Sequence, residues 1–130
     1  PERPIDASDI DERIHIAADR YQLTQALTTI INNTLRHTPT TASLALACGS
    51  DETTVRIRIS DQGPGIEPEH LGHLFERFYR ADAGRERSAG GSGLGLAIAE
   101  GIVTAHQGQI DAVSTLGEGT TITIALPLEQ

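Results

Sequence analysis

The segment Thr54–Ser60, with the sequence TVRIRIS, decides how the rest of the chain can fold. Val55, Ile57 and Ile59 point to one face of an extended strand, and the arginines and serine between or after them point to the other, because side chains alternate across a strand. A strand with one apolar and one polar face belongs to a sheet that is covered on one side only. This pattern favours antiparallel pairing over a doubly wound parallel sheet, which is buried on both faces.

Further elements are predicted outward from this segment. Alternating apolar residues predict four more strands, at 13–18, 43–48, 109–114 and 120–126. Apolar residues at helical spacing predict helices at 20–36, 68–75 and 94–106. Asp19 and Gln22 form a capping box before the first helix, and Gly108 is the expected C-cap of the last. The expected fold is an α+β two-layer sandwich, with a mixed, mostly antiparallel five-stranded sheet covered on one face by about three helices.

The composition narrows the class of protein. A chain of 130 residues that is 38% hydrophobic can form a single domain (1–130) with its own core. The net charge of −8 argues against nucleic-acid binding and against contact with an anionic membrane, both of which need a basic face. No apolar run is long enough to span a bilayer, no signal peptide opens the chain, and the single Cys48 allows no internal disulfide. A cytoplasmic domain fits these features, and Pro1–Pro4 suggests a cut point within a longer protein.

The junction Gly91–Ile98, with the sequence GSGLGLAI, joins a glycine-rich loop to an apolar helix. Glycines let backbone N–H groups approach an anion closely, and a helix start adds unpaired donors, so the junction predicts a phosphate site. All ten basic residues are arginine. A P-loop needs a lysine after its glycines and a eukaryote-type protein kinase needs a strand lysine, so both are excluded. The order G-x-G-x-G also differs from the dinucleotide-binding fingerprint.

The first predicted helix carries a polar stripe that includes Asn32 and Asn33. Asparagine is a poor helix former because its side chain competes for backbone hydrogen bonds, so two in succession suggest a polar function. An amide oxygen there could coordinate Mg²⁺, which takes oxygen ligands and keeps waters and substrate phosphates. From this helix alone, a solvated surface is an equally good explanation.

Two loops offer further polar groups. The segment Asp61–Gly65 has two explanations. It is either an ordinary Asp-Gly turn, or a binding turn whose Asp61 carboxylate accepts a hydrogen bond from an exocyclic amine while the glycines admit a flat ring. The segment 81–91 has no apolar period, and four arginines lie between 77 and 87. This loop is either a solubilising surface segment or a lid that brings guanidinium groups to phosphates. His70 and His73 could bind a metal, but no recognised set of further ligands completes the site, so a helix surface suits them better.

Together these segments resemble the ATP-binding catalytic domain of bacterial sensor histidine kinases, within the Bergerat-fold superfamily. The resemblance extends from about Ile14 to Leu126. Five sequence boxes occur in the family's order: the N box at 25–39, the G1 box at 61–66, the F box at 74–80, the G2 box at 91–96 and the last glycine box at 117–121.

The resemblance implies roles for the matching residues. Asn33 would hold Mg²⁺ against the phosphates, and Arg36 and Arg80 would meet phosphate charge, so these three are the expected catalytic residues. Asp61 would accept from the adenine amino group, and residues 81–91 would form an ATP lid. The other expected ATP-binding residues are His37 over the base, Gly63 and Gly65 at the base slot, Thr120 in a polar network near the adenine, and Gly91, Gly93, Gly95 and Leu96 around the phosphates.

Three positions depart from the family pattern. Thr29 stands where kinases of the family commonly have asparagine and the hydrolytic members have a glutamate as general base. A hydroxyl has no accessible pKa near neutrality, so Thr29 cannot activate water in that way. His37 replaces a common tyrosine and would cover less of the adenine face. Thr34 replaces a usual alanine and could tighten local packing.

No histidine of this chain lies in the family's phosphoacceptor context. The resemblance therefore implies a domain that binds Mg-ATP and donates the γ-phosphoryl group to a histidine on a separate dimerisation domain of the same parent protein, with a response regulator acting downstream. The fragment is expected to be monomeric, without the sensor and phosphoacceptor domains of a membrane-anchored parent. Two other readings stay open: a hydrolytic ATPase of the same fold, and a nucleotide-sensing module with reduced catalysis. A serine kinase of the anti-sigma-factor type shares the fold but matches residues 75–80 less well.

Overall fold

The computed structural model describes residues 5–10, 20–38, 42–76 and 95–127. Its strands are β1 (Ile5–Ile10), β2 (Leu44–Ser50), β3 (Thr54–Asp61), β4 (Gln109–Thr115) and β5 (Gly119–Pro127). Its helices are α1 (Arg20–His37), α2 (Pro68–Leu71) and α4 (Gly95–Ala105). None of the described helices is long and apolar enough to cross a membrane.

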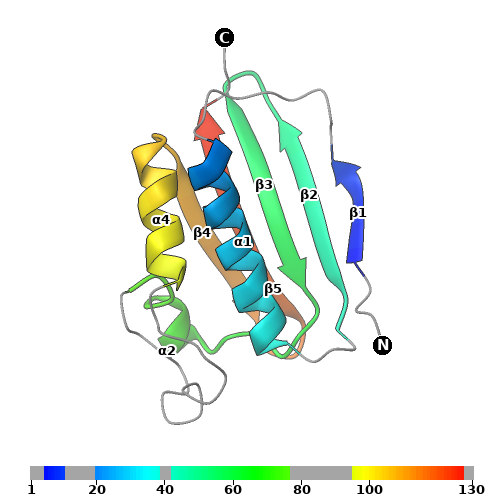
Figure 1. Ribbon diagram of the computed structural model, residues 1–130. Coiled ribbons are helices and arrows are strands. Elements are labelled where there is room, and N and C mark those ends of the chain that lie inside the picture. Colours follow the sequence, from blue (N-terminus) through cyan, green and yellow to red (C-terminus); the bar gives the residue numbers. More distant parts are fainter. Residues whose placement is uncertain (1–4, 11–19, 39–41, 77–94, 128–130) are drawn as a thin grey trace.

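The strands form one sheet in the order β1-β2-β3-β5-β4. Strands β2, β3, β5 and β4 pair antiparallel, whereas β1 pairs parallel with β2 at the edge. Helices α1 and α4 lie side by side on one face, which gives the two-layer α+β arrangement (Figure 1).

Four of the five predicted strands are confirmed, with small shifts of their ends. The expected strand at 13–18 lies outside the described residues, and so does the capping residue Asp19. The edge strand β1 was not predicted. The expected set of five strands is therefore not confirmed: four of them are present, and the remaining strand of the sheet is one that the sequence did not predict.

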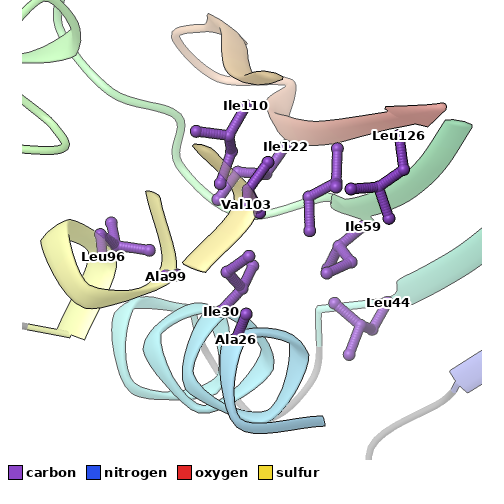
Figure 2. Close-up of a cluster of buried hydrophobic side chains, with 11 residues drawn as sticks. Ala26, Ile30, Leu44, Ile59, Leu96, Ala99, Val103, Ile110, Ile122 and Leu126 are labelled. Carbon is purple, nitrogen blue, oxygen red and sulfur yellow. The ribbon is translucent and has the colours of Figure 1, made fainter. Parts of the chain in front are cut away.

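The register between β3 and β5 arranges the covered face in rows. Val55 pairs with Leu126, Ile57 with Ile124 and Ile59 with Ile122. All except Ile57, which is half-buried, are at most 4% exposed. Ala26 and Ile30 of α1 and Ala99 and Val103 of α4, all fully buried, pack against these rows (Figure 2). The helices and the sheet therefore share a single apolar layer.

The helix ends differ from the predicted ones. Helix α2 ends at Leu71 instead of Phe75, because from Gly72 onward the backbone bonds span three residues, as in His73 N–H to the His70 carbonyl at 3.0 Å. Glycine also has a low helix propensity. Helix α4 ends in a Schellman motif whose left-handed residue is Gln107, with φ of 63°. Gly108 is the following residue, and a Cβ there would collide with the Ala125 carbonyl oxygen of β5.

The β2–β3 hairpin is closed by Asp51. Its Oδ1 accepts from the N–H groups of Thr53 at 2.9 Å and Thr54 at 2.8 Å. Its Oδ2 accepts from the Arg56 guanidinium at 2.8 Å. The Arg56 hydrogen bond, with the two backbone N–H groups, holds the pKa of the Asp51 carboxyl well below its usual range. Arg56 is thus engaged at this hairpin, at the opposite end of β3 from Asp61.

The row arrangement predicts an asymmetry between the two faces of the sheet. Ile124→Ala removes a fully buried side chain and should lower the free energy of unfolding by about 3 kcal/mol. Val113→Ala is the matched control, because Val113 is 68% exposed and should change stability by less than about 0.5 kcal/mol. Urea denaturation of the two variants measures both values. Equal losses would contradict the assignment of faces.

Candidate functional site

The last row of the covered face carries polar side chains on three of its four strands. Asp61 at the end of β3 pairs with Thr120 near the start of β5, and Leu44 and Ser114 flank this pair on β2 and β4. Thr120 is 8% exposed and Asp61 is half-buried. In Figure 1 the end of β3, the start of β5, the C-terminal end of α1 and the start of α4 all lie at the lower end of the molecule. The apolar layer therefore ends in a group of polar side chains where two helices and two strands meet.

Asp61 is held in place by the turn that follows it. Its Oδ1 accepts from the Gly63 N–H at 2.9 Å, and Oδ2 has no hydrogen-bond partner in the part of the chain that the structure describes. A half-buried carboxylate with one oxygen fixed by the backbone is a preorganised acceptor for an amino group.

The turn 62–66 is packed tightly against two other segments. A Cβ on Gly63 would lie 2.7 Å from Cγ2 of Thr38, just beyond α1. Gly65 has φ of 80°, and a Cβ there would lie 2.5 Å from the Thr115 carbonyl oxygen. These contacts require glycine at both positions. They also connect the Asp61 turn to the end of α1 and to the β4–β5 turn.

Ser114 completes the polar row, and no motif or spacing in the sequence singled it out. Its hydroxyl accepts from the Ile66 N–H at 2.7 Å, donates to the Gly119 carbonyl at 3.0 Å and lies 2.7 Å from Thr120 Oγ1. Because a serine hydroxyl has one proton, Thr120 donates in the last of these bonds. The β4–β5 register brings Ser114 beside Thr120, and that register cannot be seen in a strand pattern.

Helix α1 supplies the predicted Asn33. This side chain is half-buried, whereas the neighbouring Asn32 and Arg36 are exposed. Asn33 lies one turn after Thr29, so both are on the same helix face. Thr34, which replaces the usual alanine, is 6% exposed, and its backbone carbonyl accepts from the Thr38 hydroxyl at 2.9 Å. For His37 the structure describes the backbone only.

Helix α4 supplies Gly95 and Leu96 at its start. Leu96 is 7% exposed and belongs to the core, and Gly95 faces α1 so closely that a Cβ would lie 2.9 Å from Cγ2 of Thr29. The expected site residues Arg80, Gly91 and Gly93, and the expected lid at 81–91, lie outside the described residues.

A family model matches residues 18–130, which is most of the chain, and covers both helices and all four antiparallel strands of this site. Its description is "Histidine kinase-, DNA gyrase B-, and HSP90-like ATPase". The chain belongs to this ATPase family. The resemblance inferred from the five boxes is thereby confirmed.

Several relatives within the family are sensor kinases. Signal transduction histidine-protein kinase BaeS of Escherichia coli (strain K12) is 42% identical over 121 residues, which are 93% of this chain and 26% of that protein. The mycobacterial sensor histidine kinase MprB is similar in structure, with a TM-score of 0.80 at 30% identity over 98% of this chain and 84% of that one. Full-length ShkA in complex with AMPPNP has a TM-score of 0.80 at 27% identity and covers 99% of this chain and 26% of that one. The chain thus spans about a quarter of BaeS.

A separate set of possible metal ligands lies outside this candidate site. Glu67, Glu69 and His70, around the start of α2, have ligand atoms within 4.8 Å of one another. Both glutamates are exposed, and His73 is instead paired with Glu76. The trio includes His70 but not His73, and His70 is half-buried.

The hydroxyl network predicts that Ser114 stabilises the turn beside Asp61. Ser114→Ala removes the acceptor of the Ile66 N–H and should lower the free energy of unfolding by about 2 kcal/mol. Ser60→Ala is the control on the other face, where the hydroxyl lies 3.0 Å from Thr121 Oγ1, and it should cost about 0.5 kcal/mol. Hydrogen exchange at Ile66 should accelerate in Ser114→Ala alone. Unchanged protection of Ile66 would contradict the network.

Proposed function

We propose that this domain binds Mg-ATP and donates the γ-phosphoryl group to a histidine on the dimerisation domain of its parent protein. The observation that carries the proposal is the position of Asp61, a preorganised acceptor at the polar end of the core, in a chain of the histidine kinase-like ATPase family. The relatives named as sensor histidine kinases support the kinase reading, and the AMPPNP complex of ShkA supports ATP as the nucleotide.

The adenine end of the site is assigned to the strand ends. Asp61 Oδ2 accepts from the exocyclic amino group, and Gly63 and Gly65, which have no side chains, border the base. Thr120 adds its hydroxyl oxygen, whose proton is directed to Ser114. His37 covers one face of the base. These groups fit adenine because they offer acceptors to its amino group and a flat, glycine-lined wall to its ring.

The phosphate end is assigned to the two helices. The start of α4 at Gly95 and Leu96, with Gly91 and Gly93 before it, offers backbone N–H groups to the phosphates, and Arg36 and Arg80 contribute positive charge. Asn33 is half-buried on the α1 face next to α4 and carries an amide oxygen, which is a ligand type that Mg²⁺ prefers. The bound ion would neutralise charge on the phosphates during transfer.

In the transfer, a nitrogen of the partner histidine forms a bond to the γ-phosphorus while the bond to the β–γ bridging oxygen breaks, and ADP leaves. The protein's part in such a reaction is positioning and charge stabilisation. Thr29 argues against hydrolysis as the main activity, because its hydroxyl cannot serve as the general base that activates water.

The partners and location follow from this proposal. The acceptor histidine belongs to another domain of the same parent, and a response regulator then receives the phosphoryl group. The fragment itself, a single unit over 1–130 with 81–91 as ATP lid, would be monomeric. Its parent would be a membrane-anchored bacterial sensor that carries this domain in the cytoplasm, where ATP is available. Its net charge of −8 fits neither nucleic acid nor an anionic membrane as a partner.

The assignment of Asp61 predicts a specific loss of nucleotide binding. Asp61→Ala removes the acceptor of the adenine amino group and should weaken ATP binding by at least about a hundredfold, because a buried charge-assisted hydrogen bond is lost. Asp111→Ala is the matched control, since this aspartate is exposed on β4, and it should bind ATP like the wild type. Isothermal titration with Mg-ATP measures both. Tight ATP binding by a folded Asp61→Ala variant would overturn the site assignment.

Mixing the domain with Mg-ATP and the parent's histidine-containing domain tests the reaction itself. Acid-labile phosphate on the acceptor domain supports the kinase. Tight ATP binding without transfer would favour a nucleotide-sensing module, and rapid phosphate release without an acceptor would favour an ATPase.

A further inference from the structure

Helices α1 and α4 touch at one unusually close point. A Cβ on Gly95, the first residue of α4, would lie 2.9 Å from Cγ2 of Thr29, a distance that real Cβ atoms essentially never show. That methyl is the only atom within 4 Å of the Cβ position apart from the immediate neighbours and the helix's own backbone, in the part of the chain that the structure describes. The contact therefore depends on one methyl group and on the absence of one side chain.

The methyl group cannot move away easily. Thr29 is β-branched and lies within α1, where such side chains have few allowed χ1 rotamers. Helix α1, which carries Thr29, is itself held in place by its fully buried residues Ala26 and Ile30. Thr29 and Gly95 thus act as a rigid spacer between the two helices.

The position of this spacer gives it a consequence for the site. Asn33 lies one turn after Thr29 on the same face of α1. The first N–H groups of α4 belong to Gly95, which makes the contact with Thr29, and to the next residue. The spacer therefore sets the separation between Asn33 and the start of α4, which are the two parts of the phosphate end.

We propose that Thr29 is a positioning residue for the triphosphate: its methyl group, packed on Gly95, fixes the distance between the start of α4 and Asn33. This inference rests on the proposed function, since it assumes that ATP binds at this site. A methyl group at position 95 is excluded by this contact as long as Thr29 keeps its Cγ2. Thr29 would thus act through the shape of its methyl group, with no contact to the nucleotide.

Variants that change the size of the two side chains at this contact test the proposal. Gly95→Ala places a methyl against Thr29 and should weaken Mg-ATP binding by about tenfold. Adding Thr29→Ser removes Cγ2 and should restore ATP affinity to within about threefold of wild type, whereas adding Thr29→Val keeps a methyl in place and should not. Gly101→Ala is the matched control in the same helix, because a Cβ there has nothing within 4 Å.

A second readout separates positioning from a loss of stability. Adenosine carries no phosphate, so its affinity, measured by an NMR titration, should be unchanged in Gly95→Ala while that of ATP falls. A purely structural defect would weaken the binding of both ligands, or lower the unfolding temperature, without changing the ratio of the ATP and adenosine affinities. If Gly95→Ala does not fold, Thr29→Leu applies the same crowding from α1 with a residue that suits a helix, and it should also weaken ATP selectively.

The outcomes distinguish this inference from the proposed function. Failure of the wild-type domain to bind ATP would overturn both. If the wild-type domain binds ATP and Gly95→Ala loses no affinity, the spacer proposal alone is overturned. Equal recovery of ATP affinity by Thr29→Ser and Thr29→Val would have the same meaning.

Discussion

Asp61 of β3 is paired with Thr120 of β5. The same register pairs the apolar residues of the two strands, so that each pair forms one row of the covered face. Both strands alternate in phase, so one face carries three apolar pairs and then a single polar pair. If one of the two strands shifted by one residue, all of its side chains would turn to the opposite face, so the burial of the apolar pairs fixes the place of the polar one. The core and the candidate site are therefore specified by the same register.

The packing around the polar pair explains how a site can exist at the edge of a core without leaving polar atoms unsatisfied. Ser114 binds Thr120, the Gly119 carbonyl and the Ile66 N–H, and Asp61 receives the Gly63 N–H. Among the described residues, no buried side-chain nitrogen or oxygen lacks a hydrogen-bond partner. Since an unpaired buried polar group is costly, this network lets the polar row coexist with the apolar rows beside it. It also fixes the turn that borders the proposed base slot.

The sequence predicted those parts of the fold that depend on local pattern. The alternation in β3 and β5 and the helical spacing in α1 and α4 correctly predicted the faces and the two-layer arrangement. The family was indicated by the resemblance of the five boxes, and the family model confirms it. The edge strand β1 was missed because its sequence, IDASDI, is half polar and acidic and does not alternate clearly. It pairs parallel with β2 and with an irregular register, which a local pattern cannot indicate.

The parts of the site that depend on contacts between distant segments were beyond the sequence. Ser114 becomes notable only through its strand register, and Thr29 only through its contact with Gly95. Gln107 adopts the left-handed conformation expected of a glycine, and the glycine itself, Gly108, is the next residue, where a Cβ would collide with the Ala125 carbonyl oxygen of β5. The roles of Asn33, Asp61 and Thr120 stay predictions that the structure makes physically reasonable by bringing their elements to one end of the molecule.

The central claim is that nucleotide binds at the polar end of the covered face. An NMR titration of the isotope-labelled domain with Mg-AMPPNP tests it most directly, because each backbone amide reports its own surroundings. The account predicts shifts concentrated at Asn33, Gly63, Gly65, Leu96 and Thr120, with Arg58, Val113 and Thr123 on the open face of the sheet unaffected. Shifts centred on the open face, or on the exposed carboxylates around α2, would contradict it.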